Sequence, residues 1–213
     1  MALSQKLKVI YINVNSIVSN NKRYELLQFL EKHEPDICLL GETKLNEDHK
    51  ISFKNYELIR NDRKNSIFGG GTAILIKRNL NFEEVKINAN NKNKILETTA
   101  ISIKNRNSNK FHIISMYATN SNHKKEIIDE LNAVLNELKQ QNRETFAIIA
   151  GDFNARHTNW RDSAVNTRGA LLLDWINEKS IDFKLKFYPP ENPTYPTPEN
   201  KFVHRYSFSR FKN

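Results

Sequence analysis

Four short segments carry the polar residues of this chain whose types and spacing are best suited to chemistry. Each lies where an apolar, strand-like run ends: Asn13-Val14-Asn15-Ser16, Gly41-Glu42-Thr43, Ser115-Met116-Tyr117-Ala118 and Gly151-Asp152-Phe153-Asn154. If these strands lie side by side, the segments meet at one edge and bring together two carboxylates, three carboxamides and a phenol. Carboxylate and amide oxygens are the ligands that Mg²⁺ prefers, and such a set also suits a phosphodiester. No cluster of His and Cys at zinc spacing competes with this interpretation.

Each of these residues also has a purely structural interpretation. Asn13 and Asn15 can end a strand through Asx turns. Glu42 can start a helix or lie on the surface, Tyr117 can be an ordinary strand aromatic, and the polar residues of the tetrad 151–154 can shape a turn. Taken singly, the structural interpretation is favoured for every residue outside that tetrad. Taken together and in this order, the residues favour a catalytic site.

The apolar pattern predicts the elements that must position these segments. We expect strands at 8–13, 36–41, 56–60, 71–77, 95–103, 111–117 and 146–151, and amphipathic helices at 23–32, 123–139 and 168–178. Several strands are apolar on successive residues, which indicates cover on both faces. The expected fold class is α/β, a four-layer β-sandwich flanked by helices, although the pattern alone leaves an open doubly wound sheet as an alternative. Gly41 and Gly151 each precede an acidic residue at a strand end, where the backbone can turn sharply.

Length and composition predict one domain over residues 1–213. Hydrophobic residues make up 38% and charged residues 27%, which excludes a disordered chain, and the apolar runs are far too short to span a membrane. The N-terminus lacks a signal-peptide pattern and Cys38 is the single cysteine, so we expect an intracellular protein. The formal charge of +9 favours a phosphate-rich partner such as nucleic acid, although a generally basic soluble protein remains the alternative.

Two longer motifs make the pattern more specific. One is Gly151-Asp152-Phe153-Asn154-Ala155-Arg156-His157 with Trp160, and the other is Arg63 with Gly69-Gly70-Gly71-Thr72-Ala73-Ile74. Arg168-Gly169 then opens a leucine-rich helix, and Pro193-Thr194-Tyr195 follows it. With these motifs in order between about Lys8 and Tyr195, the chain resembles the endonuclease/exonuclease/phosphatase family, which includes deoxyribonuclease I. More narrowly, it resembles the endonuclease domains of jockey-like non-LTR retrotransposons.

The resemblance implies a role for each candidate residue. Glu42 would hold a metal ion, Mg²⁺ with Mn²⁺ as an alternative, together with Asn15, whose position is often Asp in relatives. The implied catalytic residues are Asn13 beside the metal, Tyr117 and Asn154 at the phosphate, and Asp152, which would orient or deprotonate the attacking water. Arg63, Arg156 and His157 would lie near the DNA, although solvated basic loops explain the arginines nearly as well.

The C-terminal part of the sequence departs from the family pattern. Relatives end with a strand carrying Asp and then a Ser-Asp-His-type segment, whereas here no Asp follows Asp182 and the only histidine of the tail is His204. We therefore expect a domain that lacks its last strands and has weak or no activity. The resemblance implies DNA as the substrate, action in the nucleus and a reverse transcriptase domain that originally followed. A non-catalytic nucleic-acid-binding remnant and a phosphatase of the same fold are the alternatives.

Overall fold

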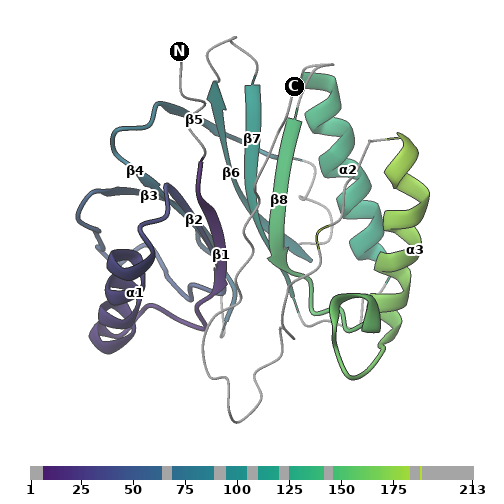
Figure 1. Cartoon of the computed structure of the whole chain (residues 1–213), viewed down its shortest axis with the longest axis horizontal. Coiled ribbons are helices and arrows are strands. Elements are labelled where there is room, and N and C mark those ends of the chain that lie inside the picture. The colour runs from purple at the N-terminus through teal and green to yellow at the C-terminus, as the bar shows by residue number, and fades with distance from the viewer. Residues whose placement is uncertain are drawn as a thin grey trace.

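Two four-stranded sheets pack face to face in the described part of the chain (Figure 1). The structure is a computed structural model that describes residues 7–63, 69–88, 95–104, 110–119, 125–141, 146–182 and 188. The first sheet has the order β1-β2-β4-β3, from β1 (Val9–Asn13), β2 (Ile37–Gly41), β3 (Tyr56–Asn61) and β4 (Thr72–Lys77). The second has the order β5-β6-β7-β8, from β5 (Phe82–Val85), β6 (Leu96–Lys104), β7 (Lys110–Ala118) and β8 (Phe146–Asp152).

Helices cover the outer face of each sheet and complete four layers (Figure 1). Helix α1 (Asn20–His33) packs on the first sheet, while α2 (Glu126–Gln141) and α3 (Thr167–Asp182) pack on the second. A short 3-10 helix, η2 (Thr158–Trp160), precedes α3. The expected α/β four-layer sandwich is therefore confirmed. The expected loss of the last strands concerns residues after Asp182, of which the structure describes Tyr188 alone.

The strand directions bring the polar segments to one edge. Strands β1 and β2 are parallel, with Asn13 opposite Gly41, and β7 and β8 are parallel, with Tyr117 opposite Asp152. Strands β4 and β6 are antiparallel to these neighbours, so their first residues reach the same edge, where Thr72 lies opposite Gly41. The strand ends that sequence analysis singled out therefore share one edge of the sandwich.

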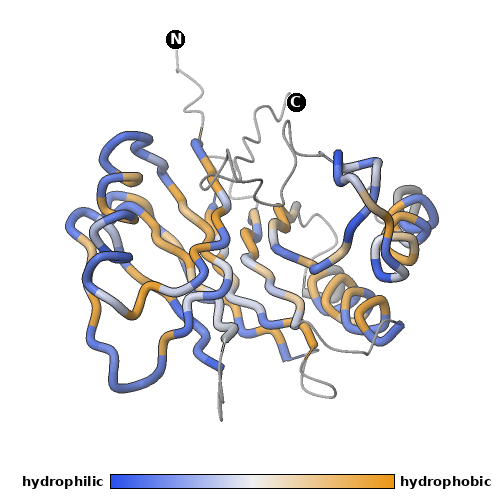
Figure 2. Tube along the Cα trace, turned by 90° about the horizontal axis from the view of Figure 1, so that it is seen from below, coloured by the Kyte–Doolittle hydropathy of each residue, from blue (hydrophilic) through white to orange (hydrophobic). Residues whose placement is uncertain are grey.

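Three apolar clusters account for the unbroken apolar runs in the sequence. One fills the space between the sheets and includes Leu39 and Ile74, and the other two lie beneath the helices on either side. Along β2, Leu39 points into the space between the sheets and the next residue, Leu40, points toward α1, and both are fully buried. The hydrophobic segments accordingly gather inside the molecule and the hydrophilic ones outside (Figure 2). None of the helices described is long and apolar enough to cross a membrane.

Local signals explain where the elements differ from the predicted bounds. Helix α1 starts three residues before the predicted 23–32, because the Ser19 side chain accepts a hydrogen bond from the Lys22 backbone and caps it. It ends at His33, and the next residue, Glu34, has a left-handed φ of 44° and donates its backbone N–H to the Leu30 carbonyl. Strand β5 was not predicted at all. It is a short strand at the end of the sheet order, with Glu83 and Glu84 exposed, and such strands show little apolar pattern.

Truncating a side chain in the core between the sheets should destabilise the protein far more than truncating a side chain at the surface. Ile74 is fully buried, so Ile74→Ala should lower the free energy of unfolding by about 2–5 kcal/mol through lost burial and a cavity. Val165 is 53% exposed, and Val165→Ala should change it by less than about 0.5 kcal/mol. Urea unfolding measures both values. Equal losses in the two variants would contradict the assigned core.

Candidate active site

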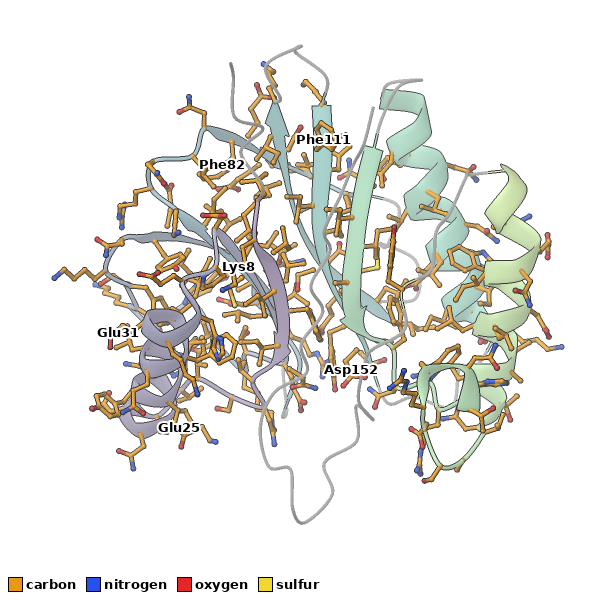
Figure 3. All side chains as sticks on the ribbon, viewed as in Figure 1. Lys8, Glu25, Glu31, Phe82, Phe111 and Asp152 are labelled. Carbon is orange, nitrogen blue, oxygen red and sulfur yellow. The ribbon has the colours of Figure 1, made fainter. Side chains whose placement is uncertain are left out.

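Asp152 is held at the end of β8 by groups from both sheets. Asn13 at the end of β1 donates its amide Nδ2 to Asp152 Oδ2 at 2.7 Å, across the gap between the sheets. The backbone N–H of Asn154 donates to Asp152 Oδ1 at 2.9 Å. Asp152 lies at the opposite end of the sandwich from Phe82 and Phe111 (Figure 3). One carboxylate thus receives a fixed hydrogen bond on each oxygen and keeps lone pairs for a further donor.

Glycine is required immediately before Asp152. A Cβ on Gly151 would lie 2.4 Å from the backbone oxygen of Met116 on the neighbouring strand, closer than any real contact. At Gly41, before Glu42, a Cβ would lie 2.2 Å from the Tyr11 hydroxyl. The two glycines of the sequence motif therefore allow backbone and side chains to pack closely just inside the edge.

Several residues after the strand ends adopt left-handed backbone conformations without being glycine. Asn15, Glu42, Lys44 and Asn154 have φ of 43°, 57°, 56° and 49°. Asparagine tolerates this region, whereas for Glu and Lys it costs of order 1 kcal/mol each. Hydrogen bonds between the adjoining loops hold this conformation, including Lys44 N to the Gly70 carbonyl at 2.8 Å. Strain of this kind collects at functional sites, where side chains must point in unusual directions.

Glu42 and Asn15 converge on a single cationic atom. The ammonium of Lys44 lies 3.3 Å from Glu42 Oε1 and donates to Asn15 Oδ1 at 2.6 Å. No group of three or more His, Cys, Asp and Glu in the described residues is arranged to hold a metal ion. A Mg²⁺ ion needs few protein ligands because it retains waters, so one carboxylate and one amide oxygen that already share a cation fit it.

Tyr117 lies beside these groups and is buried. Burial raises its pKa to about 12, the negative charges of Glu42 and Asp152 add to the rise, and a hydrogen bond from Asn154 and the charge of Arg63 oppose it. The Asn154 amide also donates to the Ala118 carbonyl at 2.7 Å. At neutral pH the phenol is protonated and able to donate a hydrogen bond.

Arg63 reaches the site from the first sheet and pairs with Glu97 of β6. Its Nε donates to Glu97 Oε1, and its guanidinium carbon lies 5.9 Å from the centre of the Tyr117 ring. Sequence analysis missed Glu97 and Lys44. Glu97 had a usable signal, a single carboxylate in a strand whose other residues are mostly apolar or Thr. Lys44 had none, since a lysine after a strand is common on any surface.

Arg156 and His157 organise the loop that follows Asn154. Arg156 donates from Nε and Nη2 to Asp162 Oδ1 at 3.0 and 2.9 Å. Burial opposes ionisation of Asp162, but hydrogen bonds from Arg156 and the backbone lower its pKa below the usual value. His157 Nδ1 accepts from the Asn159 backbone at 3.1 Å, and its ring packs against Trp160. Contact of Arg156 and His157 with DNA stays a prediction.

Arg168, which the sequence motif placed at the start of a helix, contacts the chain segments that follow β7 and β8. Its side chain is buried and donates to the carbonyls of Thr119 and Phe153 at 3.0 and 3.3 Å. Burial lowers its pKa, while the nearby Asp152 and Tyr117 act in the opposite direction. The guanidinium therefore fixes the two chain segments that leave β7 and β8.

The chain is similar to several known proteins, in part of its sequence or in its fold. A family model described as endonuclease-reverse transcriptase matches residues 111–203. The AP endonuclease LMAP from Leishmania major has a TM-score of 0.67 at 15% identity, covering 84% of this chain and 68% of that chain. The endonuclease domain of TRAS1, a telomere-specific non-LTR retrotransposon, has a TM-score of 0.60 at 15% identity, covering 81% and 70%. A humanized TDP2 from D. rerio has a TM-score of 0.53 at 20% identity, covering 72% and 68%. The expected resemblance to the endonuclease/exonuclease/phosphatase family, an enzyme family, is confirmed.

The raised pKa of Tyr117 has a consequence at alkaline pH. The folded protein holds this proton to about pH 12, whereas the unfolded chain releases it near its usual value of about 10. Stability from the neutral phenol is complete below pH 10 and is lost as pH rises toward 12. Tyr117→Phe should therefore lose less unfolding free energy than the parent chain between pH 10 and 12. Urea unfolding at several pH values measures this loss.

Tyr24→Phe is the matched control, because Tyr24 is 62% exposed and its change should leave the pH dependence of the parent intact. An identical alkaline loss in the parent and in Tyr117→Phe would show that Tyr117 has an ordinary pKa.

Proposed function

We propose that this chain is a divalent-metal-dependent DNA endonuclease domain of a retrotransposon, which nicks target DNA by hydrolysing a phosphodiester bond. The observation that carries the proposal is the fixed Asp152 carboxylate, bonded to Asn13 and Asn154 and lying opposite Tyr117 in the strand register. Glu42 and Asn15 both contact the ammonium of Lys44 at the same edge. This set offers a base, hydrogen-bond donors and a cation site, which are the groups that phosphodiester hydrolysis needs.

Asp152 is the proposed base. Hydrogen bonds from Asn13 and Asn154 prevent its carboxylate from rotating, so its remaining lone pairs keep a constant direction. A water that donates to one of them is oriented for in-line attack on phosphorus, and its proton passes to the carboxylate. Asn13 acts through Asp152 and is therefore a positioning residue in this scheme.

Tyr117 and Asn154 are proposed to hold the phosphate. The Tyr117 phenol is protonated at neutral pH, and burial and two nearby carboxylates disfavour its anion further. It can therefore donate to a phosphate oxygen that gains charge in the transition state. Asn154 hydrogen-bonds this phenol and the Ala118 carbonyl, which fixes both donors relative to Asp152.

Glu42 and Asn15 are proposed to hold the divalent ion, Mg²⁺ or Mn²⁺. When bound, the ion would neutralise negative charge on the phosphate oxygens. The left-handed backbone of both residues directs their oxygens toward one point, where the Lys44 ammonium lies. The formal charge of +9 and the name of the matching family support DNA as the substrate and a reverse transcriptase as the associated activity. Action in the nucleus follows from such a substrate.

Mutation of the proposed base tests the function directly. The folded chain should nick supercoiled plasmid in the presence of Mg²⁺. Nicking should be slow, because neither the Asp nor the Ser-Asp-His-type segment of the family occurs in this sequence after Asp182. Asp152→Asn should reduce the nicking rate by roughly 100-fold or more, the contribution of a general base. Asp174→Asn removes an exposed carboxylate of α3 and should leave the rate unchanged. Gel electrophoresis of plasmid over long incubations measures all three.

Equal nicking by Asp152→Asn and the parent chain would refute the assignment. Absence of nicking with either Mg²⁺ or Mn²⁺ would refute the activity, and salt-sensitive DNA binding would then identify a non-catalytic nucleic-acid-binding domain. Phosphate release from a phosphomonoester without nicking would identify a phosphatase.

Lys44 should compete with the divalent ion. Two unit charges 3.3 Å apart interact by about 1 kcal/mol even at the dielectric constant of water, which corresponds to roughly tenfold in affinity. Lys44→Met should therefore lower the Mn²⁺ concentration that stabilises the protein to thermal unfolding by roughly tenfold. The measurement is the melting temperature across a Mn²⁺ titration, with Lys50→Met, an exposed lysine of the following loop, as the control. An unchanged or higher Mn²⁺ midpoint in Lys44→Met would remove Glu42 and Asn15 as the ion's ligands.

A further inference from the structure

The three consecutive glycines before β4 are shaped around the Arg63 side chain. Gly69, Gly70 and Gly71 all have positive φ, of 93°, 80° and 84°. A Cβ on Gly70 would lie 2.1 Å from Arg63 Nη2, so no other residue allows the guanidinium to lie on the backbone there. A Cβ on Gly69 would be 3.9 Å from Glu42 Oε1 and 4.0 Å from Arg63 Nη1. The guanidinium and the proposed metal-binding carboxylate therefore flank the same loop.

Glu97 fixes both the loop and the arginine. One of its oxygens accepts from Arg63 Nε, and the other accepts from the Gly71 backbone N–H at 2.5 Å. Its side chain is only 13% exposed, which strengthens both interactions. In the strand register Glu97 lies directly opposite Tyr117. A single carboxylate thus sets the position of Arg63 relative to the phenol.

The hydrogen bonds of Arg63 are incomplete within the protein. Among the residues that the structure describes, its buried Nη2 has no hydrogen-bond partner, and a buried unpaired donor costs about 1–3 kcal/mol. The side chain as a whole remains 26% exposed, beside Tyr117 and the Gly69 loop. A planar guanidinium with unused donors is suited to phosphate oxygens, which it binds through two N–H groups at once.

We propose that Arg63 binds the scissile phosphate of DNA and that Glu97 is the positioning residue that fixes Arg63 for this contact. The inference rests on the proposed nuclease function, for which it supplies a phosphate-binding cation on the side of the site that faces the first sheet. Glu97 carries the wrong charge to contact DNA itself. Its contribution is to hold the guanidinium beside Tyr117, so that ordering the arginine costs little when the phosphate arrives.

The sign of one substitution separates positioning from general electrostatics. Glu97→Gln removes a negative charge, and charge alone would make the protein bind DNA more tightly. If Glu97 positions Arg63, the same substitution weakens binding, by roughly 5- to 10-fold. Glu57→Gln removes an equal charge from an exposed position near the start of β3, opposite Ile76 and away from the site, and should tighten binding slightly or leave it unchanged.

Binding is measured by fluorescence anisotropy of a labelled DNA duplex at several salt concentrations, in the Asp152→Asn background and without divalent ions. Arg63→Met should weaken binding and reduce the slope of log affinity against log salt by about 0.9, the value for one phosphate contact. Arg78→Met removes an exposed arginine just after β4, at the opposite edge, and should leave affinity and slope nearly unchanged. Adding Glu97→Gln to Arg63→Met should cause little further loss, because both remove the same contact.

A second variant tests the inference even if Glu97→Gln fails to fold. Arg63→Lys keeps the charge but lacks the Nε–H that Glu97 accepts, so it should bind DNA almost as weakly as Arg63→Met. Binding by Glu97→Gln as tight as that of its parent, or full binding by Arg63→Lys, would overturn the inference. Neither outcome depends on nicking. If the parent chain showed no nicking that depends on Asp152, by contrast, the proposed function would be refuted and the binding result would still stand.

Discussion

The hydrogen bond between Asn13 and Asp152 joins the two sheets at the point where the proposed chemistry takes place. It is 2.7 Å long and links the end of β1 to the end of β8. It requires the two sheets to be correctly docked, both parallel pairs to end at the same edge, and Gly151 to approach β7 closely. The core between the sheets thus does more than stabilise the fold, since any slip of one sheet over the other would separate Asp152, the proposed base, from Asn13.

Three positively charged side chains lie at this edge beside carboxylates or carbonyl oxygens. Lys44 lies against Glu42, Arg63 against Glu97, and the buried Arg168 beneath the segments that follow β7 and β8. Each positive charge is held by a carboxylate or by carbonyl oxygens, which limits the cost of burying it. The proposed phosphodiester substrate would bring negative charge to this edge, and partly neutralised carboxylates would repel it less than bare carboxylates.

Much of the fold and most of the polar residues at this edge are predictable from sequence, for a definite reason. Parallel strands end at a common edge, so residues after apolar strands, such as Glu42 and Asp152, can be placed together from pattern alone. Glu97 could not be placed, because its contact with Arg63 depends on the register of an antiparallel strand, which hydrophobic periodicity does not specify. Strand β5 was missed since its edge position removes the apolar pattern, and α1 ends at a left-handed glutamate that no propensity predicts.

The parallel pairing of β7 with β8 and the contact between β1 and β8 also constrain how the chain reaches its native state. Asn13 and Asp152 are separated by 139 positions, so their contact closes a loop that spans most of the described chain. Loop closure of this length is entropically costly and slow compared with formation of a helix or of the antiparallel strands β3 and β4. We therefore expect the surroundings of Asp152 to assemble late in folding, after the elements on either side have formed. A partly folded chain would contain most of its secondary structure but would lack the Asn13–Asp152 contact of the proposed site.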